Sequence, residues 1–175
     1  KLLPLTSWLH SWAAIVASML IWLAAAIAIA SNWTRFESSW STVLHRSNWL
    51  WLGVAWLFLK IIHELSHAVA CRRHGGEVRD SGMIFILLAP VAYVDVTSSL
   101  SFPSRWQRIQ TAAAGIYVEL TVASLAAIAW TVTDSPLLSH HLVNLIWSAS
   151  VTTIVFNANP LMKFDGYYVL SDLLD

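Results

Sequence analysis

The chain has 175 residues, of which 57% are hydrophobic and only 11% are charged, and its mean hydropathy is +0.61. Because a soluble domain usually carries about a quarter charged residues, this composition excludes an ordinary soluble domain and indicates an integral membrane protein. The formal net charge of zero gives no support for a nucleic-acid partner. Cys71 is the only cysteine, which excludes an internal disulfide.

Four apolar segments are long enough to cross the hydrocarbon layer of a bilayer, which takes about 20 helical residues. In chain order they are residues 5–30, 48–70, 109–132 and 137–157. A polar stretch separates the first two, and a short turn containing Pro136 separates the last two. The sequence therefore predicts an all-α membrane protein with about four transmembrane helices in the lipid bilayer.

The stretch between the second and third spans, residues 75–103, does not have a helical pattern. Gly75 and Gly76 end the preceding helix, and residues 83–96 are rich in strand-forming residues, with Pro90 in the middle. Pro90 favours a bend or an edge strand. Open backbone at membrane depth must be covered by protein or line a cavity. We therefore expect a short re-entrant or interfacial β-hairpin between the second and third helices.

The arginines give the orientation of the chain. Five of them lie between the second and third spans, two lie in residues 31–47, and none lies in the turn at 133–136. The positive-inside rule therefore places the hairpin on the cytoplasmic side and both other connections outside. The second helix then runs from the outside to the inside of the membrane.

A short polar motif lies near the inner end of the second span, with the sequence His63-Glu64-Leu65-Ser66-His67. Residues four apart share one face of a helix, so both imidazoles can reach one zinc ion. Glu64 directly follows the first histidine, which lets its carboxylate face water at the metal. Ionisable side chains within a span are costly to bury and indicate a functional site. We predict that His63 and His67 bind Zn²⁺ and that Glu64 is the catalytic base.

A catalytic zinc that keeps one position open for water needs a third protein ligand. Three carboxylates are candidates: Asp165 after the fourth span, Glu119 in the middle of the third, and Asp95 after the hairpin. Glu119 could instead form a hydrogen bond between helices or orient a metal ligand. Asp95 is better placed to cap a turn. The residues alone leave the choice open, with Asp165 as the first candidate.

The segment at 157–166 has the composition of a helix end that turns back. Pro160 breaks the helix, and the side chains of Asn157 and Asn159 can satisfy the backbone groups that the break frees. Gly166 then allows the chain to turn and to present Asp165 inward.

Lys60 lies on the same helix face as the histidine motif, three residues before His63. Near the middle of a span its ammonium group needs a partner or water. We expect Lys60 to pair with Glu64 or with a substrate carbonyl, or to extend toward the membrane interface.

Together these motifs resemble the site-2 protease family of intramembrane zinc metalloproteases. The resemblance rests on His-Glu-x-x-His at 63–67 and on Asn-x-x-Pro-x-x-x-x-Asp-Gly at 157–166, which begins 90 residues after His67. Arg72-Arg73-x-Gly75 and the predicted hairpin also fit. The resemblance covers residues 48–175. Within the family, the chain resembles bacterial peptide zinc metalloproteases that are found with peptide-export systems.

This resemblance implies that His63, His67 and Asp165 are zinc ligands and that Glu64 is the base. It implies hydrolysis of membrane-embedded or membrane-associated peptides in a bacterial inner membrane, with the active site towards the cytoplasm. Export-system proteins are candidate partners. Residues 48–175 would form the protease core, residues 1–47 an accessory helix and external loop, and the chain would be a fragment of a longer protein. The alternative is a zinc-binding partner of an export system without proteolytic activity.

The chain departs from the family pattern at two places. Ser66 stands where the family usually has glycine. Residues 114–119, Ala-Gly-Ile-Tyr-Val-Glu, stand where the family often has Ala-Gly-Pro-x-x-Asn. Glu119 therefore takes the position of an asparagine that contacts the substrate backbone. We assign Asn157, Asn159, Glu119 and Lys60 to supporting or substrate-binding roles.

Overall fold

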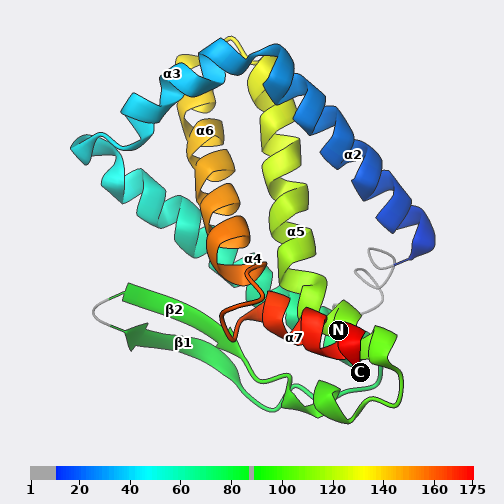
Figure 1. The fold of residues 1–175 in the computed structure, drawn as a ribbon. Coiled ribbons are helices and arrows are strands. Elements are labelled where there is room, and N and C mark those ends of the chain that lie inside the picture. The colour runs from blue at the N-terminus through cyan, green and yellow to red at the C-terminus, as the bar shows by residue number, and fades with distance from the viewer. Residues whose placement is uncertain (1–10, 87–88) are drawn as a thin grey trace.

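The computed structural model describes residues 11–86 and 89–175 (Figure 1). Its longer helices, in chain order, are α2 (Trp12–Ser31), α3 (Trp33–Val43), α4 (Trp49–Arg73), α5 (Arg105–Val132), α6 (Pro136–Val151) and α7 (Asp165–Leu174). The two strands are β1 (Ser81–Ile86) and β2 (Ala89–Val94). Three short helical segments complete the fold: η2 (Arg46–Asn48), η3 (Thr97–Ser101) and the π-helix η4 (Thr152–Asn157).

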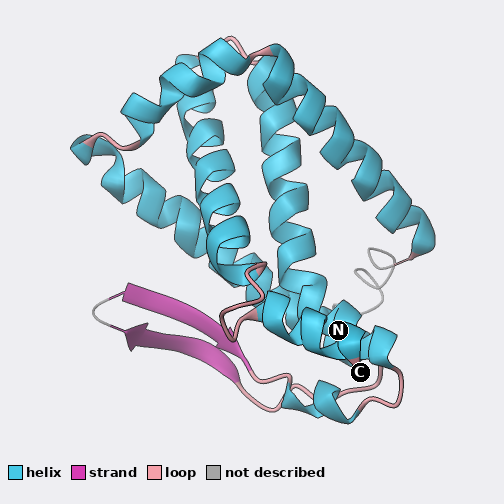
Figure 2. Cartoon of the chain, viewed as in Figure 1, coloured by secondary structure: helices cyan, strands magenta, loops and turns pink. Residues whose placement is uncertain are grey.

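Three helical segments of the described chain are long and apolar enough to cross a membrane: Trp12–Ser31, Arg46–Arg73 and Arg105–Val132. They correspond to the first three predicted spans, although residues 5–10 of the first lie outside the described part. The fourth predicted span, residues 137–157, is divided between α6, which has 16 residues, and the six-residue η4. The structure confirms a mostly helical membrane fold with a short antiparallel hairpin (Figure 2).

Helix α5 is the centre of the bundle and packs against α2, α4, α6 and α7 (Figure 1). One end of the bundle, next to α3, is filled by a cluster of buried apolar side chains, which we call the apolar end: Ala25, Val43, Ala126, Ala127, Trp130, Val143 and Ile146. The hairpin, η3 and α7 lie at the opposite end (Figure 1).

The polar stretch that the sequence predicts as an external loop contains an 11-residue helix, α3. One side of this helix packs on the bundle through aromatic groups. Phe36 stacks on Trp147 with ring centroids 4.9 Å apart, and the Arg35 guanidinium lies 4.3 Å from the centroid of the Trp130 ring. Amphipathic packing of this kind stabilises a helix that is too polar to cross a membrane.

Pro90 lies within β2, opposite Phe85, and not at the bend of the hairpin. Asp80 and Asp95 are the next opposed residues beyond the Ser81–Val94 pair. The Asp95 amide donates a hydrogen bond to the Asp80 carbonyl oxygen at 2.8 Å, so Asp80 and Asp95 form a hydrogen-bonded pair. Because hydrogen-bonded and non-hydrogen-bonded pairs alternate along an antiparallel ladder, Pro90 falls at a non-hydrogen-bonded position. Its missing N–H therefore costs no bond to β1, which explains why the strand tolerates a proline.

Candidate metal centre

The two histidines of the motif lie together on one face of α4, one turn apart. Their ring centroids are 4.7 Å apart and their Nε2 atoms are 3.0 Å apart. Both side chains are buried, with 3% of His63 and 6% of His67 exposed. The helical spacing therefore brings the two nitrogen atoms to one point in the interior.

Asp165 reaches the same point from the other end of the chain. It is the first residue of α7, and its Oδ2 lies 3.1 Å from Nε2 of His63 and 3.4 Å from Nε2 of His67. A close approach fixes where α7 begins, because a Cβ on Gly166 would lie 2.5 Å from the backbone carbonyl of Ala158. Glycine at 166 thus lets α7 start directly against the preceding turn, with Asp165 facing α4.

The geometry of these three side chains fits a metal ion. Ligand atoms around a tetrahedral zinc with bonds of about 2.0–2.1 Å lie roughly 3.3 Å apart, close to the observed separations of 3.0, 3.1 and 3.4 Å. Oδ2 of Asp165 is buried and accepts no hydrogen bond from the described residues. Two imidazoles and a carboxylate are a donor set that suits zinc.

The other nitrogen of each imidazole faces an oxygen on the neighbouring helices. Nδ1 of His67 lies 2.8 Å from the backbone carbonyl oxygen of Thr111 in α5. Nδ1 of His63 lies 3.1 Å from Oε1 of Glu119, also in α5. An acceptor at Nδ1 favours the tautomer whose Nε2 is free to bind metal. Both rings are therefore oriented with Nε2 toward Asp165.

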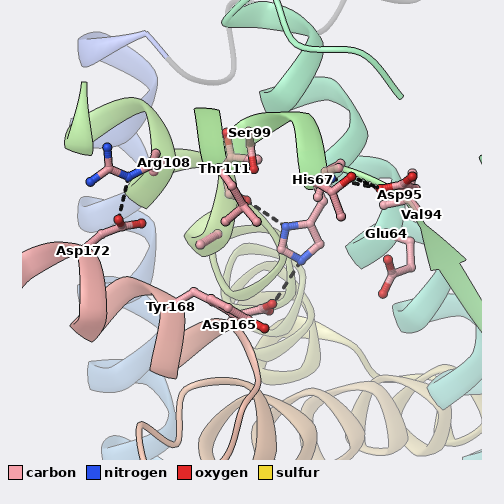
Figure 3. A pocket seen from close by; sticks show the side chains of 14 residues that line it. Glu64, His67, Val94, Asp95, Ser99, Arg108, Thr111, Asp165, Tyr168 and Asp172 are labelled. Carbon is pink, nitrogen blue, oxygen red and sulfur yellow. Dashed lines mark hydrogen bonds and ion pairs between the residues drawn. The ribbon is translucent and has the colours of Figure 1, made fainter. Parts of the chain in front are cut away.

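Glu64 lies beside this cluster at the junction of two cavities. One cavity, of about 290 Å³, is enclosed by α4, β2, η3, α5 and α7, and its lining includes Glu64, His67 and Asp165 (Figure 3). The other, of about 340 Å³, lies between α4 and the hairpin and also includes Glu64. Val94 of β2 lines both cavities. No hydrogen bond ties the half-buried Glu64 carboxylate to the described residues, so it is accessible from either cavity.

A family model described as peptidase family M50 matches residues 51–143, which is more than half of the chain. This chain is a member of peptidase family M50, the site-2 protease family. Among curated proteins and solved structures, no significant match to the chain is found.

The matched range of this M50 peptidase includes the histidine motif, the hairpin and Glu119, and it ends before η4 and α7. Asp165 therefore lies outside the family match. Its place in the centre rests on the geometry of this chain, in which His63, His67 and Asp165 form the one group of possible metal ligands among residues 11–86 and 89–175. The assignment of these residues as ligands remains a prediction.

The other two carboxylates that the sequence offers as ligands have different contacts. Oδ1 of Asp95 accepts hydrogen bonds from the backbone amide and the hydroxyl of Thr97, at 2.9 and 2.7 Å, which caps the turn into η3. Glu119 meets His63 at Nδ1, on the opposite side of the ring from the Nε2 that faces Asp165. Neither carboxylate lies with the three converging ligand atoms.

Of the three other predicted residues, Lys60 and Asn157 lie at the buried Glu119 carboxylate, and Asn159 bonds to backbone groups. Lys60 contacts Glu119 and Asn157, with Nζ 3.6 Å from Glu119 Oε1 and 3.4 Å from Asn157 Oδ1, and not Glu64 as the sequence suggests. Asn157 is buried beside these charges, whereas we expected it to satisfy free backbone groups. Asn159 does satisfy such groups: it donates to the Val155 carbonyl and accepts from the Leu161 amide.

The residue pattern alone does not predict a functional role for two residues of the centre, Gly115 and Ser66. A Cβ on Gly115 of α5 would lie only 2.3–2.5 Å from the ring of His63, so a glycine is required for α4 and α5 to approach at the site. Ser66 donates a hydrogen bond of 2.6 Å to the Ala114 carbonyl oxygen across the same helix contact. The family resemblance marks both positions, but only the helix packing shows what they contact.

Proposed function

We propose that this M50 peptidase is an intramembrane zinc metalloprotease that hydrolyses peptide bonds in membrane-embedded or membrane-associated peptides. His63, His67 and Asp165 are the proposed zinc ligands, and Glu64 is the proposed base. The observation that carries the proposal is the convergence of three ligand atoms, 3.0–3.4 Å apart, beside an unpaired carboxylate that faces two cavities.

The chemistry follows from the positions of these side chains. Zinc, when held by the three ligands, acidifies water and polarises the peptide carbonyl. Glu64 takes the proton from the attacking water and later delivers it to the leaving amine. Since Glu64 directly follows His63 on α4, the helix places its backbone beside the metal centre.

The proposed substrate is a peptide that lies in or on the membrane. The cavity between α4 and the hairpin is lined by apolar groups such as Ile61, Leu65 and Met83, which suit an apolar substrate side chain. The helix that carries the site ends in Arg72 and Arg73, so the positive-inside rule favours a site that opens to the cytoplasm. The resemblance to bacterial peptide zinc metalloproteases favours a bacterial inner membrane. Export-system proteins remain candidate partners.

A helical substrate hides its scissile backbone and must be extended before cleavage. We expect the extended segment to pair with β2, because β2 contacts α4 and lies between β1 and the helices (Figure 1). Ala92 and Val94, like Pro90, lie at non-hydrogen-bonded positions of the ladder, so their amides point away from β1. These two N–H groups are the proposed donors to the substrate.

Substitution Glu64→Gln tests the proposed reaction. The purified wild type and the variant are compared for zinc content and for cleavage of a synthetic transmembrane peptide in lipid vesicles. We expect equal zinc content and a loss of cleavage of at least about 100-fold, the contribution of a general base. Equal cleavage by both proteins would exclude the proposed base. A wild type that binds zinc and cleaves no membrane peptide would favour the alternative of a non-proteolytic zinc-binding partner.

The third ligand is tested by Asp165→Asn, with Asp95→Asn as the matched control. Both carboxylates line the same cavity, but only Asp165 lies with the histidines. We expect Asp165→Asn to lose zinc during dialysis and Asp95→Asn to keep it. Equal zinc content in the two variants would contradict the assignment.

Strand pairing is tested by Ala92→Pro, with Ala92→Ser as the control that keeps the N–H group. Proline at this position removes an amide that faces away from β1, so the hairpin ladder stays intact. We expect Ala92→Pro to bind zinc normally and to lose cleavage. Undiminished cleavage would exclude pairing at Ala92.

A further inference from the structure

Glu119 is a carboxylate at the centre of the membrane-spanning helix α5, with 0% of its surface exposed. An ionisable group at such a position is costly unless other groups compensate it. Its counter-charge is Lys60 of α4, whose Nζ lies 3.6 Å from Oε1 of Glu119 and whose side chain is 15% exposed. The proposed reaction uses neither residue as a ligand or as a base.

One oxygen of the Glu119 carboxylate is fixed by the π-helix η4. Oε2 accepts a hydrogen bond from the Thr153 hydroxyl and another, of 2.9 Å, from Nδ2 of Asn157. The same Asn157 side chain accepts from Lys60 through its Oδ1, at 3.4 Å. Asn157 thus bridges the two opposite charges. π-Helical turns often occur at functional sites, and here the turn supplies both polar contacts.

The other oxygen, Oε1, points toward the proposed zinc ligand His63. Oε1 is buried and lies 3.1 Å from Nδ1 of His63. Among the described residues, no donor is aligned well enough to form a hydrogen bond with it. His67 differs, because its Nδ1 faces the neutral carbonyl of Thr111. A carboxylate at this place on a metal-binding histidine fixes its tautomer and raises its basicity.

We propose that Glu119 is a positioning residue for the metal centre and that Lys60 is its built-in counter-ion. Glu119 accepts the hydrogen bond from Nδ1–H of His63 and so holds Nε2 toward the metal. Lys60 and Asn157 hold the carboxylate in this place, so that it orients a ligand and does not become one. This inference rests on the proposed zinc centre, and it gives Glu119 a role different from that of the substrate-binding asparagine implied by the family resemblance.

The charges around the centre support this pairing. The three carboxylates Glu64, Glu119 and Asp165 and the single ammonium of Lys60 give a formal charge of −3 + 1 = −2, which a divalent cation neutralises. Removal of the Glu119 charge alone would leave Lys60 as an uncompensated cation beside the metal. Loss of Lys60 in the same protein would remove that repulsion.

The test uses the full chain in detergent and measures zinc affinity by competition with a chelator. We expect Glu119→Gln, which keeps the shape of the side chain, to raise the Kd for zinc about 10- to 100-fold. The double variant Glu119→Gln with Lys60→Met should recover part of this loss, because the unpaired ammonium is gone. Thr121→Val is the control in the same helix, since its hydroxyl contacts Trp22 and not the centre.

A second readout reports the orientation of the ring directly. In ¹⁵N-histidine NMR spectra of the zinc-loaded protein, we expect His63 of the wild type to carry its proton on Nδ1 and Glu119→Gln to alter that signal. Unchanged affinity and an unchanged His63 signal in Glu119→Gln would overturn the proposal, as would an equal loss of affinity in Thr121→Val. A wild type that binds no zinc would instead contradict the proposed function itself.

Discussion

The two ends of the same helix bundle are packed in opposite ways. At the apolar end, α5 contributes Trp130 and two alanines to a cluster of apolar side chains. About three turns away along α5, Glu119 lies in a cluster of charges and amides with no exposed surface. Many combinations of apolar residues can fill a core, whereas a buried polar cluster requires each donor and acceptor to be matched. The comparison indicates that the apolar end holds the helices together and that the polar end sets their positions precisely.

Truncation at the apolar end should affect stability and leave the site intact. Trp130 is 1% exposed and packs against Phe36 and the Arg35 guanidinium. We expect Trp130→Ala to cost about 3 kcal/mol of unfolding free energy, at the low end for tryptophan truncation, because lipid solvates apolar groups and mainly packing is lost. Unfolding in detergent measures the cost. An unchanged Kd for zinc below the unfolding temperature would confirm that the two ends are independent.

A single methyl group at the polar end should have the opposite effect. The Cβ of Gly115→Ala would lie 2.3–2.5 Å from the His63 ring, so the ring must move away from the metal centre. We expect zinc affinity to fall about 100-fold, the upper range of an overpacking cost. Gly53→Ala in α4 is the matched control, because nothing lies within 4 Å of its Cβ. If both variants bind zinc as tightly as the wild type, the close contact of α5 with the His63 ring at Gly115 does not position the metal ligand.

A methyl group at the start of α7 should have a smaller effect. The Cβ of Gly166→Ala would meet the Ala158 backbone at 2.5 Å and push the first turn of α7 outward, together with Asp165. Since the Asp165 side chain is 19% exposed and the His63 side chain only 4%, Asp165 has more room to return to the centre than the His63 ring has. We therefore expect roughly a 10-fold loss of zinc affinity, at the lower range of overpacking costs. Calorimetric titration with zinc measures it, and a loss larger than that of Gly115→Ala would reverse the expected order.

The smallest effect is expected at Ser66. Its hydroxyl donates to the Ala114 carbonyl at the contact between α4 and α5. Because hydrogen bonds between membrane helices contribute about 0.6 kcal/mol on average, Ser66→Ala should lower stability by about that amount. Zinc affinity should be unchanged, since the backbone carbonyl can keep its bond within the helix. A measurable change in zinc affinity would show that this bond also fixes the separation of the two helices at Gly115.

The sequence predicts the parts of this fold that depend on local pattern. The histidine motif requires only a helix to bring its two rings together, and the apolar runs of α2, α4 and α5 are evident from length and hydropathy. Helix α3 is missed because its polar residues resemble a loop, although Phe36 belongs to an apolar stripe that packs on α6. The π-helix η4 and the pairing of Lys60 with Glu119 depend on contacts between helices far apart in the sequence, for which no local signal exists.

The separation of the metal ligands along the chain has a consequence for the order of assembly. In the proposed ligand set, His67 and Asp165 are 98 residues apart, with the hairpin, α5 and α6 between them. Zinc would then act as a cross-link that closes a long loop and docks α7, a ten-residue helix too short to be stable alone. A nascent chain that has inserted its spanning helices but has not yet docked α7 carries the base and two ligands without the third. Such a protease would become competent only after α5 and α6 have inserted and α7 has docked.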